Sequence, residues 1–458
     1  MSAFSHAVDE PPPALLEHAD LARLRPHRGT ACYAMAGERF SGTAEFTLPV
    51  SGQAIIAFAT KGERSDQNLG ENLVIEGNTD DGPFTITCPR AHVKHMDRAA
   101  RKDGGWSLIS PMNEPARINY HHGGPAARVV VLLNNFDYEC GDVVEGNGGW
   151  TRIGTPFAAT IDERVVTFSH TPLGPRLRPL AAAQVIPAAS LVECAVSLRD
   201  GEGDDDLLAV ATDIAGLCTI AAGGTVSVAM LTFLDEDGRT VRRLIPQPVT
   251  SRYRRNGIVD DRWLVQFLSS TYPAFAAMKQ AHEPWRKLSS YCGSLEDPPY
   301  LEQKFAALMM AIEFFARNCL IEEGQPEQVV AKLDFPALVG AAKRKLGWDI
   351  PKHYTARDAV RLWRNAVMHG GEWPDADTAA FRRLFDKWRL FLFRRVLIRL
   401  GYQGDVVSPD KGWASSSPVG DFTEEHNAFV PVAPDDIANV RKLNEHIRAF
   451  NAQAKESD

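Results

Sequence analysis

Short β-branched and aromatic segments, separated by turn-forming clusters, fill the first half of the chain and constrain its fold most strongly. Clusters such as GNTDDGP at 77–83 and KDGG at 102–105 break these segments at short intervals. Such runs, bounded by Gly, Asn and Asp, are typical of strands joined by tight turns. We therefore expect a mostly antiparallel sandwich or barrel-like sheet rather than βαβ units. The expected strands are 43–50, 53–60, 72–76, 84–88, 106–109, 128–134, 165–170 and 191–198.

Apolar residues at helical spacing replace this pattern after residue 300. One apolar stripe runs along 301–319, and the segment 379–400 is apolar on most of its circumference. A single stripe indicates an amphipathic helix, whereas a helix with so wide an apolar surface needs two partners. We expect 379–400 to pack on its own bundle and across a dimer interface. The chain is thus expected to be α+β, with a β-rich N-terminal domain followed by an all-α C-terminal domain.

Composition shifts and Pro/Gly-rich stretches suggest five parts in this 458-residue chain, which is too long for one ordinary core. GSLEDPP at 293–299 is interpreted as a linker. The expected parts are a flexible arm at 1–27, a β-rich domain at 28–200, a helix-hairpin-helix extension and linker at 201–298, a helical domain at 299–405 and a tail with a helix at 406–458. Within the extension we expect helices at 207–222 and 260–280 and hairpin strands at 225–233 and 240–245.

The formal net charge of −8 is unevenly spread along the chain. Residues 301–405 carry 17 Lys and Arg against 13 Asp and Glu, a balance of +4. A basic helical module on an acidic partner is compatible with binding RNA, and it is equally compatible with ordinary solvated helix faces.

Several absences in the sequence indicate a cytoplasmic protein. No run of 18 apolar residues is present, so we expect no transmembrane helix and no membrane partner. The N-terminus has early acids and prolines and no apolar h-region, unlike a signal peptide. The seven cysteines form no short pairs, which favours free thiols in a reducing compartment.

The segment TARDAVRLWRNAVMHGG at 355–371 has the pattern of a half-buried helix that carries polar residues on its other face. Thr-x-x-Asp at its start is typical of a helix N-terminus, and Gly-Gly is typical of a helix end. Five apolar residues between 359 and 367 recur at helical spacing. The other face carries Arg361, Arg364, Asn365 and His369, so a guanidinium, an amide and an imidazole gather at the helix end.

The residues Arg364-Asn365-x-x-x-His369 resemble the Arg-polar-x(3–5)-His signature of the HEPN superfamily, whose active members are ribonucleases. Among the Arg-x4-His spacings of the chain, only this one has an Asn directly after the Arg, an expected helix around it and a glycine stop after the His. With a helical module after a β-rich half, the chain resembles the ApeA-like HEPN proteins, which are bacterial anti-phage, abortive-infection ribonucleases. The motif resemblance covers about 300–402. The bare Arg-x4-His spacing also occurs at Arg90/His95, Arg117/His122 and Arg441/His446.

The resemblance implies a metal-independent endoribonuclease without cofactors, in which two HEPN domains pair as a homodimer and both Arg/His sets face one cleft. It implies catalytic roles for Arg364, Asn365 and His369, with Glu313 and Arg361 as auxiliary candidates. It also implies that the N-terminal domain senses a phage-derived trigger or regulates the nuclease.

The chemistry is consistent with these residue types. RNA carries its own nucleophile, the 2′-OH, so cleavage needs a proton acceptor, a proton donor and charge stabilisation at the phosphate. Histidine titrates near neutral pH, and arginine matches phosphate oxygens with a fixed fork of donors.

Two alternatives remain open. The helices could form a non-catalytic HEPN dimerisation module that carries a β-rich ligand- or partner-binding domain. Cys88, His92 and His95, with His121 and His122 downstream, have the residue types of zinc ligands, but their spacing matches no familiar finger. We interpret these residues as scattered surface residues, with a zinc enzyme in the β half as the competing hypothesis.

Overall fold

The structure is a computed structural model of the chain in which two compact units can be distinguished. We call Met1–Gly216 with Val226–Arg255 the β unit, and Leu217–Thr225 with Asn256–Asp458 the helical unit. Antiparallel strands precede helices along the chain, so the expected α+β class is confirmed at this level. The structure describes residues 27–35, 38–47, 55–59, 67–69, 73–79, 82–88, 91–96, 106–111, 115–121, 124–138, 143–146, 149–152, 155–171, 190–246, 257–349, 378–407 and 416–423.

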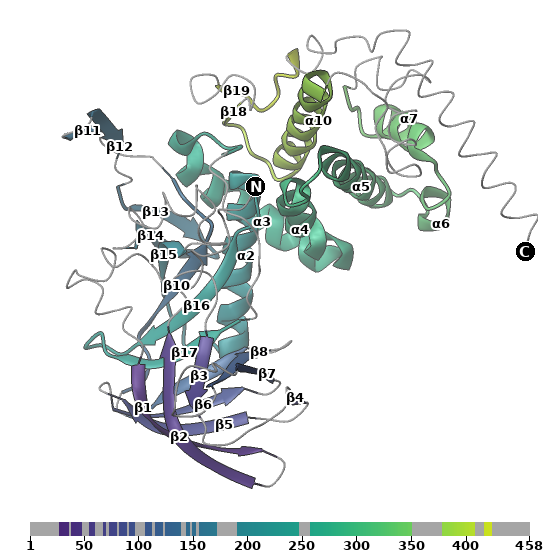
Figure 1. The fold of residues 1–458 in the computed structure, drawn as a ribbon. Coiled ribbons are helices and arrows are strands. Elements are labelled where there is room, and N and C mark those ends of the chain that lie inside the picture. The colour runs from purple at the N-terminus through teal and green to yellow at the C-terminus, as the bar shows by residue number, and fades with distance from the viewer. Residues whose placement is uncertain are drawn as a thin grey trace, which may run out of the picture. The chain divides into compact units, whose positions relative to one another are not determined.

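The described strands of the β unit pair antiparallel throughout, and fifteen of them form one sheet (Figure 1). The order in the sheet is β13-β14-β15-β10-β16-β17-β9-β6-β5-β1-β2-β3-β8-β7-β4. The bounds are β1 His27–Met35, β2 Glu38–Thr47, β3 Ile55–Ala59, β4 Gln67–Leu69, β5 Leu73–Thr79, β6 Gly82–Cys88, β7 Ala91–Met96, β8 Trp106–Pro111, β9 Ala116–Tyr120, β10 Arg128–Asn134, β13 Phe157–Ile161, β14 Arg164–His170, β15 Ser190–Ser197, β16 Ser227–Leu234 and β17 Thr240–Ile245. A separate hairpin consists of β11 Val143–Gly146 and β12 Gly149–Arg152.

The hairpin β16–β17 lies inside this sheet, between β10 and β9, although the sequence places it in the 201–298 extension. Its turn contains Gly238 with a φ of 78°, and the N–H of Gly238 donates to the carbonyl oxygen of Asp235. Most side chains of β16 are buried, whereas β9 alternates between buried and exposed positions. A strand that is covered on both faces is apolar throughout, and a strand covered on one face alternates.

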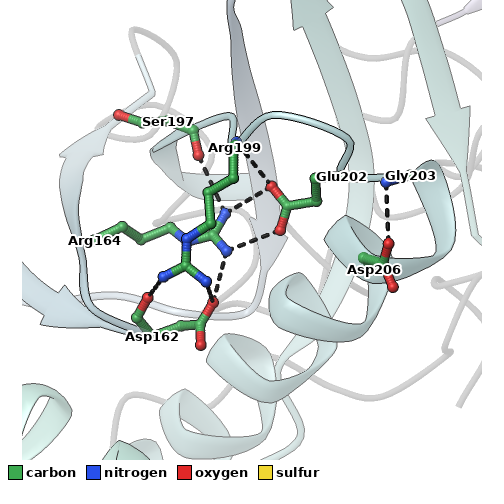
Figure 2. A network of polar contacts seen from close by, with 7 residues as sticks. All are labelled: Asp162, Arg164, Ser197, Arg199, Glu202, Gly203 and Asp206. Atoms are coloured by element: carbon green, nitrogen blue, oxygen red, sulfur yellow. Dashed lines mark hydrogen bonds and ion pairs between the residues drawn. The ribbon is translucent and has the colours of Figure 1, made fainter.

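A polar network around Arg164 joins the β13–β14 turn to the residues just before α2 (Asp204–Ala222), as Figure 2 shows. The Arg164 guanidinium donates to both carboxylate oxygens of Glu202 at 2.8 and 2.9 Å and to Asp162 Oδ2 at 2.6 Å. It also donates to the carbonyl oxygen of Ser197 at 3.2 Å. Asp162 and Glu163 both have positive φ, as the two-residue turns that follow the twist of a hairpin require. The network therefore fixes a strained turn and the approach to α2 at one point.

The start of α2 is stabilised by carboxylates in its first turn. Asp206 Oδ2 accepts a hydrogen bond from the N–H of Gly203 at 3.0 Å, and Asp204 pairs with Arg242 of β17 at 2.7 Å. Acids at this end of a helix complement its dipole and its unpaired N–H groups. The helix consequently begins at Asp204, three residues before its expected start.

Helix α5 is central to the packing of the helical unit, since it contacts α4, α6, α7 and α10 (Figure 1). Phe305 of α5 lies 5.1 Å from Phe381 of α10 between ring centroids, and Phe335 of α7 lies 6.3 Å from Trp388 of α10. The bounds are η3 Asp261–Trp263, α3 Leu264–Ala281, η4 Glu283–Lys287, α4 Leu288–Gly293, η5 Ser294–Glu296, α5 Leu301–Glu322, α6 Glu327–Val330, α7 Phe335–Lys345, α10 Thr378–Arg399, β18 Asp405–Val407 and β19 Ser416–Pro418.

The segment 293–299, interpreted as a linker in the sequence, is part of the core of the helical unit. Leu295 is 0% exposed and Glu296 is 1% exposed. A Cβ on Gly293 would lie 2.7 Å from Thr225 Oγ1 and 3.0 Å from Thr225 Cα, so the backbones pack with no space for a side chain. Gly293 thus serves close packing rather than a free connection, whereas Pro299 at the other end of the segment is exposed.

Among the helices that the structure describes, none combines the length and the apolar composition needed to cross a membrane.

Candidate functional site

Arg361, Arg364, Asn365 and His369 lie within 350–377, outside the described residues, so their arrangement stays a prediction. The described chain resumes on both sides of this segment, at Trp348 and Asp349 before it and at α10 after it. These two flanks are the described parts of the chain next to the motif.

The upstream flank is anchored by Trp348. Its ring is stacked on Phe315 of α5 at 5.8 Å and meets Phe391 of α10 edge-on at 5.9 Å between centroids. Arg395 lies with its guanidinium carbon 5.7 Å from the centre of the Trp348 ring and donates to the carbonyl oxygen of Asp349 at 3.2 Å. The last described residues before the motif are therefore fixed to α5 and α10 by stacking and by a charge-assisted hydrogen bond.

The downstream flank, α10, is buried over most of its circumference by this chain alone. Arg383, Ile398 and Arg399 are its exposed side chains within 381–399. The expectation that its apolar surface packs on its own bundle agrees with this burial. The described part of α10 leaves no wide apolar face for the dimer contact that the sequence also suggests.

A cluster of charges surrounds Glu296 in the core of the helical unit. Lys304 Nζ donates to its Oε2 at 2.8 Å, Arg382 Nη2 donates to its Oε1 at 3.0 Å, and Arg389 Nη1 lies 3.9 Å from Oε1. Asp386 Oδ2 accepts from Arg382 Nε at 3.1 Å. Burial disfavours the charged form of Glu296, but Arg389, Lys304 and Arg382 outweigh this effect and hold the pKa of Glu296 below its ordinary value. Buried charges persist only when paired in this way, so the cluster ties η5 to α5 and α10.

This cluster is not apparent from the sequence. Its sequence signals are an acidic residue in a Pro-rich stretch and arginines on the apolar helix 379–400. Neither feature specifies a partner, because Glu296 and Arg389 are brought together only by the tertiary fold.

Glu313, the auxiliary candidate, lies on α5 and is the one member of the expected site within the described residues. Its Oε2 is 3.7 Å from Arg317 Nη2, one helical turn further on. Arg317 also donates to the carbonyl oxygens of Val330 and Leu333. In these contacts Glu313 helps Arg317 hold the α6 turn against α5, while its auxiliary role stays a prediction.

The metal hypothesis falls mostly outside the described side chains. Cys88 ends β6, and His92 and His95 lie in β7, but only the backbone of these residues is described. His121 is exposed and its Nε2 lies 2.8 Å from Thr85 Oγ1, whereas His122 is outside the described residues. Within the part of the chain that the structure describes, no three His, Cys, Asp or Glu side chains are grouped as a metal site requires.

Comparisons with protein-family models, with curated proteins and with solved structures gave no match for this chain.

Proposed function

We propose that this protein is a metal-independent endoribonuclease of HEPN type that acts in anti-phage defence by abortive infection. The observation that carries the proposal is the Arg364-Asn365-x-x-x-His369 motif itself, which in the sequence follows α7 and precedes α10, two helices that both pack on α5. The anchoring of Trp348 and Asp349 supports a motif that is presented from a rigid scaffold. Rigid support of this kind is what a site needs to hold reacting groups in place.

Each residue of the motif has a distinct role in the proposed reaction. His369 accepts the proton of the RNA 2′-OH or donates a proton to the leaving 5′-oxygen. Arg364 stabilises the charge that develops on the phosphate. Asn365, one helical turn before His369, orients the imidazole. Attack by the 2′-OH leaves a 2′,3′-cyclic phosphate and a 5′-hydroxyl.

A homodimer completes this mechanism, because one chain supplies one His and one Arg while cleavage uses both an acid and a base. Two apolar side chains of α5 that lie outside its buried stripe support pairing through the helical unit. Met310 is 47% exposed on this helix, and Phe314, one turn further on, is half-buried and stacked on Tyr291. In the proposed arrangement the β unit senses a phage-derived trigger and restrains the nuclease until it arrives.

The proposal is tested by incubating the purified chain with RNA in EDTA, alone and after exposure to phage-infected cell extract. Wild type is expected to cleave, and Arg364→Ala and His369→Ala are expected to lose at least about a hundredfold in rate, within the usual range for a catalytic acid–base group. Arg383→Ala, which removes an exposed arginine of α10, is the matched control and is expected to cleave as wild type does. Equal cleavage by all four proteins would contradict the assignment.

The competing function is a non-catalytic helical pairing module with a ligand-binding β unit. It predicts that no trigger elicits RNA turnover, while wild type, Arg364→Ala and His369→Ala remain dimeric to the same extent in sedimentation.

A further inference from the structure

The C-terminal turn of α7 carries three consecutive exposed cations, Lys343, Arg344 and Lys345. Within the described residues none of these three side chains has a hydrogen bond or an ion pair. This distinguishes them from most of the described cations of the helical unit. Lys304 and Arg382 are bound to Glu296. The other bound cations include Arg317, Arg389, Arg394, Arg395 and Arg399.

The helix dipole accounts for only part of this arrangement. A cation in the last turn of a helix is stabilised by the partial negative charge there, and one residue is sufficient for that effect. Consecutive helical residues point about 100° apart, so three of them spread positive charge over more than half of the circumference of the helix end. The exposed Asp349 is four residues beyond Lys345, and its backbone carbonyl accepts from Arg395. The end of α7 therefore keeps a net positive charge that faces solvent.

The position of this basic end in the chain indicates its partner. The segment 350–377, which carries Arg364 and His369, begins five residues after Lys345. We infer that Lys343, Arg344 and Lys345 bind the sugar-phosphate backbone of single-stranded RNA, the substrate of the cleavage motif proposed in the segment that follows them in the sequence. The inference rests on the proposed function for the choice of RNA, and it deepens that function by assigning residues that hold the substrate without taking part in the reaction. Arg344 matches phosphate oxygens with its fork of donors, and the two lysines act as point charges.

The test measures RNA affinity separately from cleavage. The full-length His369→Ala chain binds a fluorescent single-stranded RNA of about 20 nucleotides in EDTA, and anisotropy is followed through a KCl titration. In this background Lys343→Gln/Arg344→Gln is compared with Arg286→Gln/Lys287→Gln. The second pair is a matched control, because it removes the same two charges from adjacent exposed positions of η4 in the same unit.

The logarithm of RNA affinity falls as the logarithm of the salt concentration rises, and removing two phosphate contacts from a single strand makes this slope shallower by about 1.4. At about 0.1 M salt this change corresponds to binding that is roughly 10- to 30-fold weaker. We expect this change for the α7 pair and less than about a twofold change for the η4 pair. Equal effects of the two pairs, or an absence of RNA binding in the parent chain, would overturn the inference.

Two parallel measurements separate this result from other outcomes. Cleavage by the chain with His369 intact tests the proposed function, so a chain that cleaves RNA but binds it independently of α7 contradicts the inference alone. A chain that binds RNA through α7 but never cleaves it contradicts the proposed nuclease function and leaves the inference about α7 intact. Binding to vesicles rich in phosphatidylserine is measured with the same variants, and dependence of vesicle binding but not RNA binding on the α7 pair would overturn the choice of RNA.

Discussion

Arg389 of α10 donates from Nη2 to the carbonyl oxygen of Gly223 at 2.8 Å, which joins α10 to the residue that ends α2. Gly223 has a φ of 64°, and a Cβ at this position would lie 2.5 Å from Arg389 Nη2 and 2.6 Å from Ile258 Cγ1. The contact requires both the left-handed backbone of a glycine and the absence of a side chain.

Gly223→Ala is therefore expected to lower the free energy of unfolding by about 2 to 5 kcal/mol, from the left-handed backbone and from overpacking together. Gly324→Ala is the matched control, since Gly324 also has a positive φ but no atom lies within 4 Å of a Cβ placed there. It should lose only the backbone contribution of about 1 to 2 kcal/mol. Urea unfolding followed by tryptophan fluorescence measures both, and equal losses would show that packing at Gly223 is unimportant.

Glu202 should make the stability of the β unit depend on pH. Its hydrogen bond from Arg164 lowers its pKa below the ordinary 4.5, although burial acts in the opposite direction. A carboxyl with a lowered pKa stabilises the folded state above 4.5 and loses this contribution as the pH falls through its pKa in the folded protein. Glu202→Gln is expected to cost about 2 kcal/mol near neutral pH, and the cost should shrink below about pH 4.5.

Denaturant titrations between about pH 6 and about pH 3 compare Glu202→Gln with Glu163→Gln. Glu163 is an exposed carboxyl in the turn next to Arg164, so its replacement should change stability by less than about 0.5 kcal/mol at every pH. A loss for Glu202→Gln that does not vary with pH would contradict the assignment to its charge.

The buried thiols should be inert in the folded protein. Cys194, Cys218, Cys292 and Cys319 are buried thiols that form no disulfide. Burial raises the pKa of Cys292 and of Cys319 to about 12, and it raises the pKa of Cys218 as well. Since the thiolate is the reactive form, iodoacetamide at about pH 8 should leave these four residues unlabelled until denaturant is added. Peptide mass mapping measures the labelling, and rapid modification of any of the four without denaturant would contradict its burial.

Trp348 should be the main anchor of the chain just before the motif. Trp348→Ala removes the contacts with Phe315 and Phe391, and we expect a loss of about 3 to 5 kcal/mol in the stability of the helical unit. Trp348→Phe retains an aromatic ring at the same position and should lose less. Val329→Ala is the control, because the side chain of Val329 is 53% exposed and its truncation should cost less than about 0.5 kcal/mol. Thermal unfolding compares the three, and a Trp348→Ala value similar to the control would refute the anchor.

Local patterns predicted the elements of the fold better than their arrangement. Strand β10 has the expected bounds, and the strands β16 and β17 lie within two residues of the expected hairpin, whose Asp-Gly turn is a local signal. The order of the sheet was not predictable, because β10 pairs with β15 and β16, partners about 60 and 100 residues away, and no local pattern encodes that choice.

For the candidate site, too, local patterns are predictable from the sequence and tertiary contacts are not. The motif around Arg364 is a local pattern of one expected helix and is visible in the sequence, whereas the contacts of the described residues before it are not. Trp348 was not singled out, since its neighbours Phe315 and Phe391 come from two other helices. The composition of the segment 293–299 is that of a loop and therefore predicts a linker, whereas only the tertiary fold surrounds Glu296 with cations.

The cluster around Glu296 is asymmetric in its tolerance of change during evolution. Lys304, Arg382 and Arg389 share one carboxylate, so a lineage can lose any one of them and still leave the anion with two neutralising neighbours. Losing Glu296 instead leaves these cations facing one another with Asp386 as the remaining acid among the cluster's residues. Sequence drift is therefore expected to be permitted at the three basic positions one at a time and to be barred at Glu296.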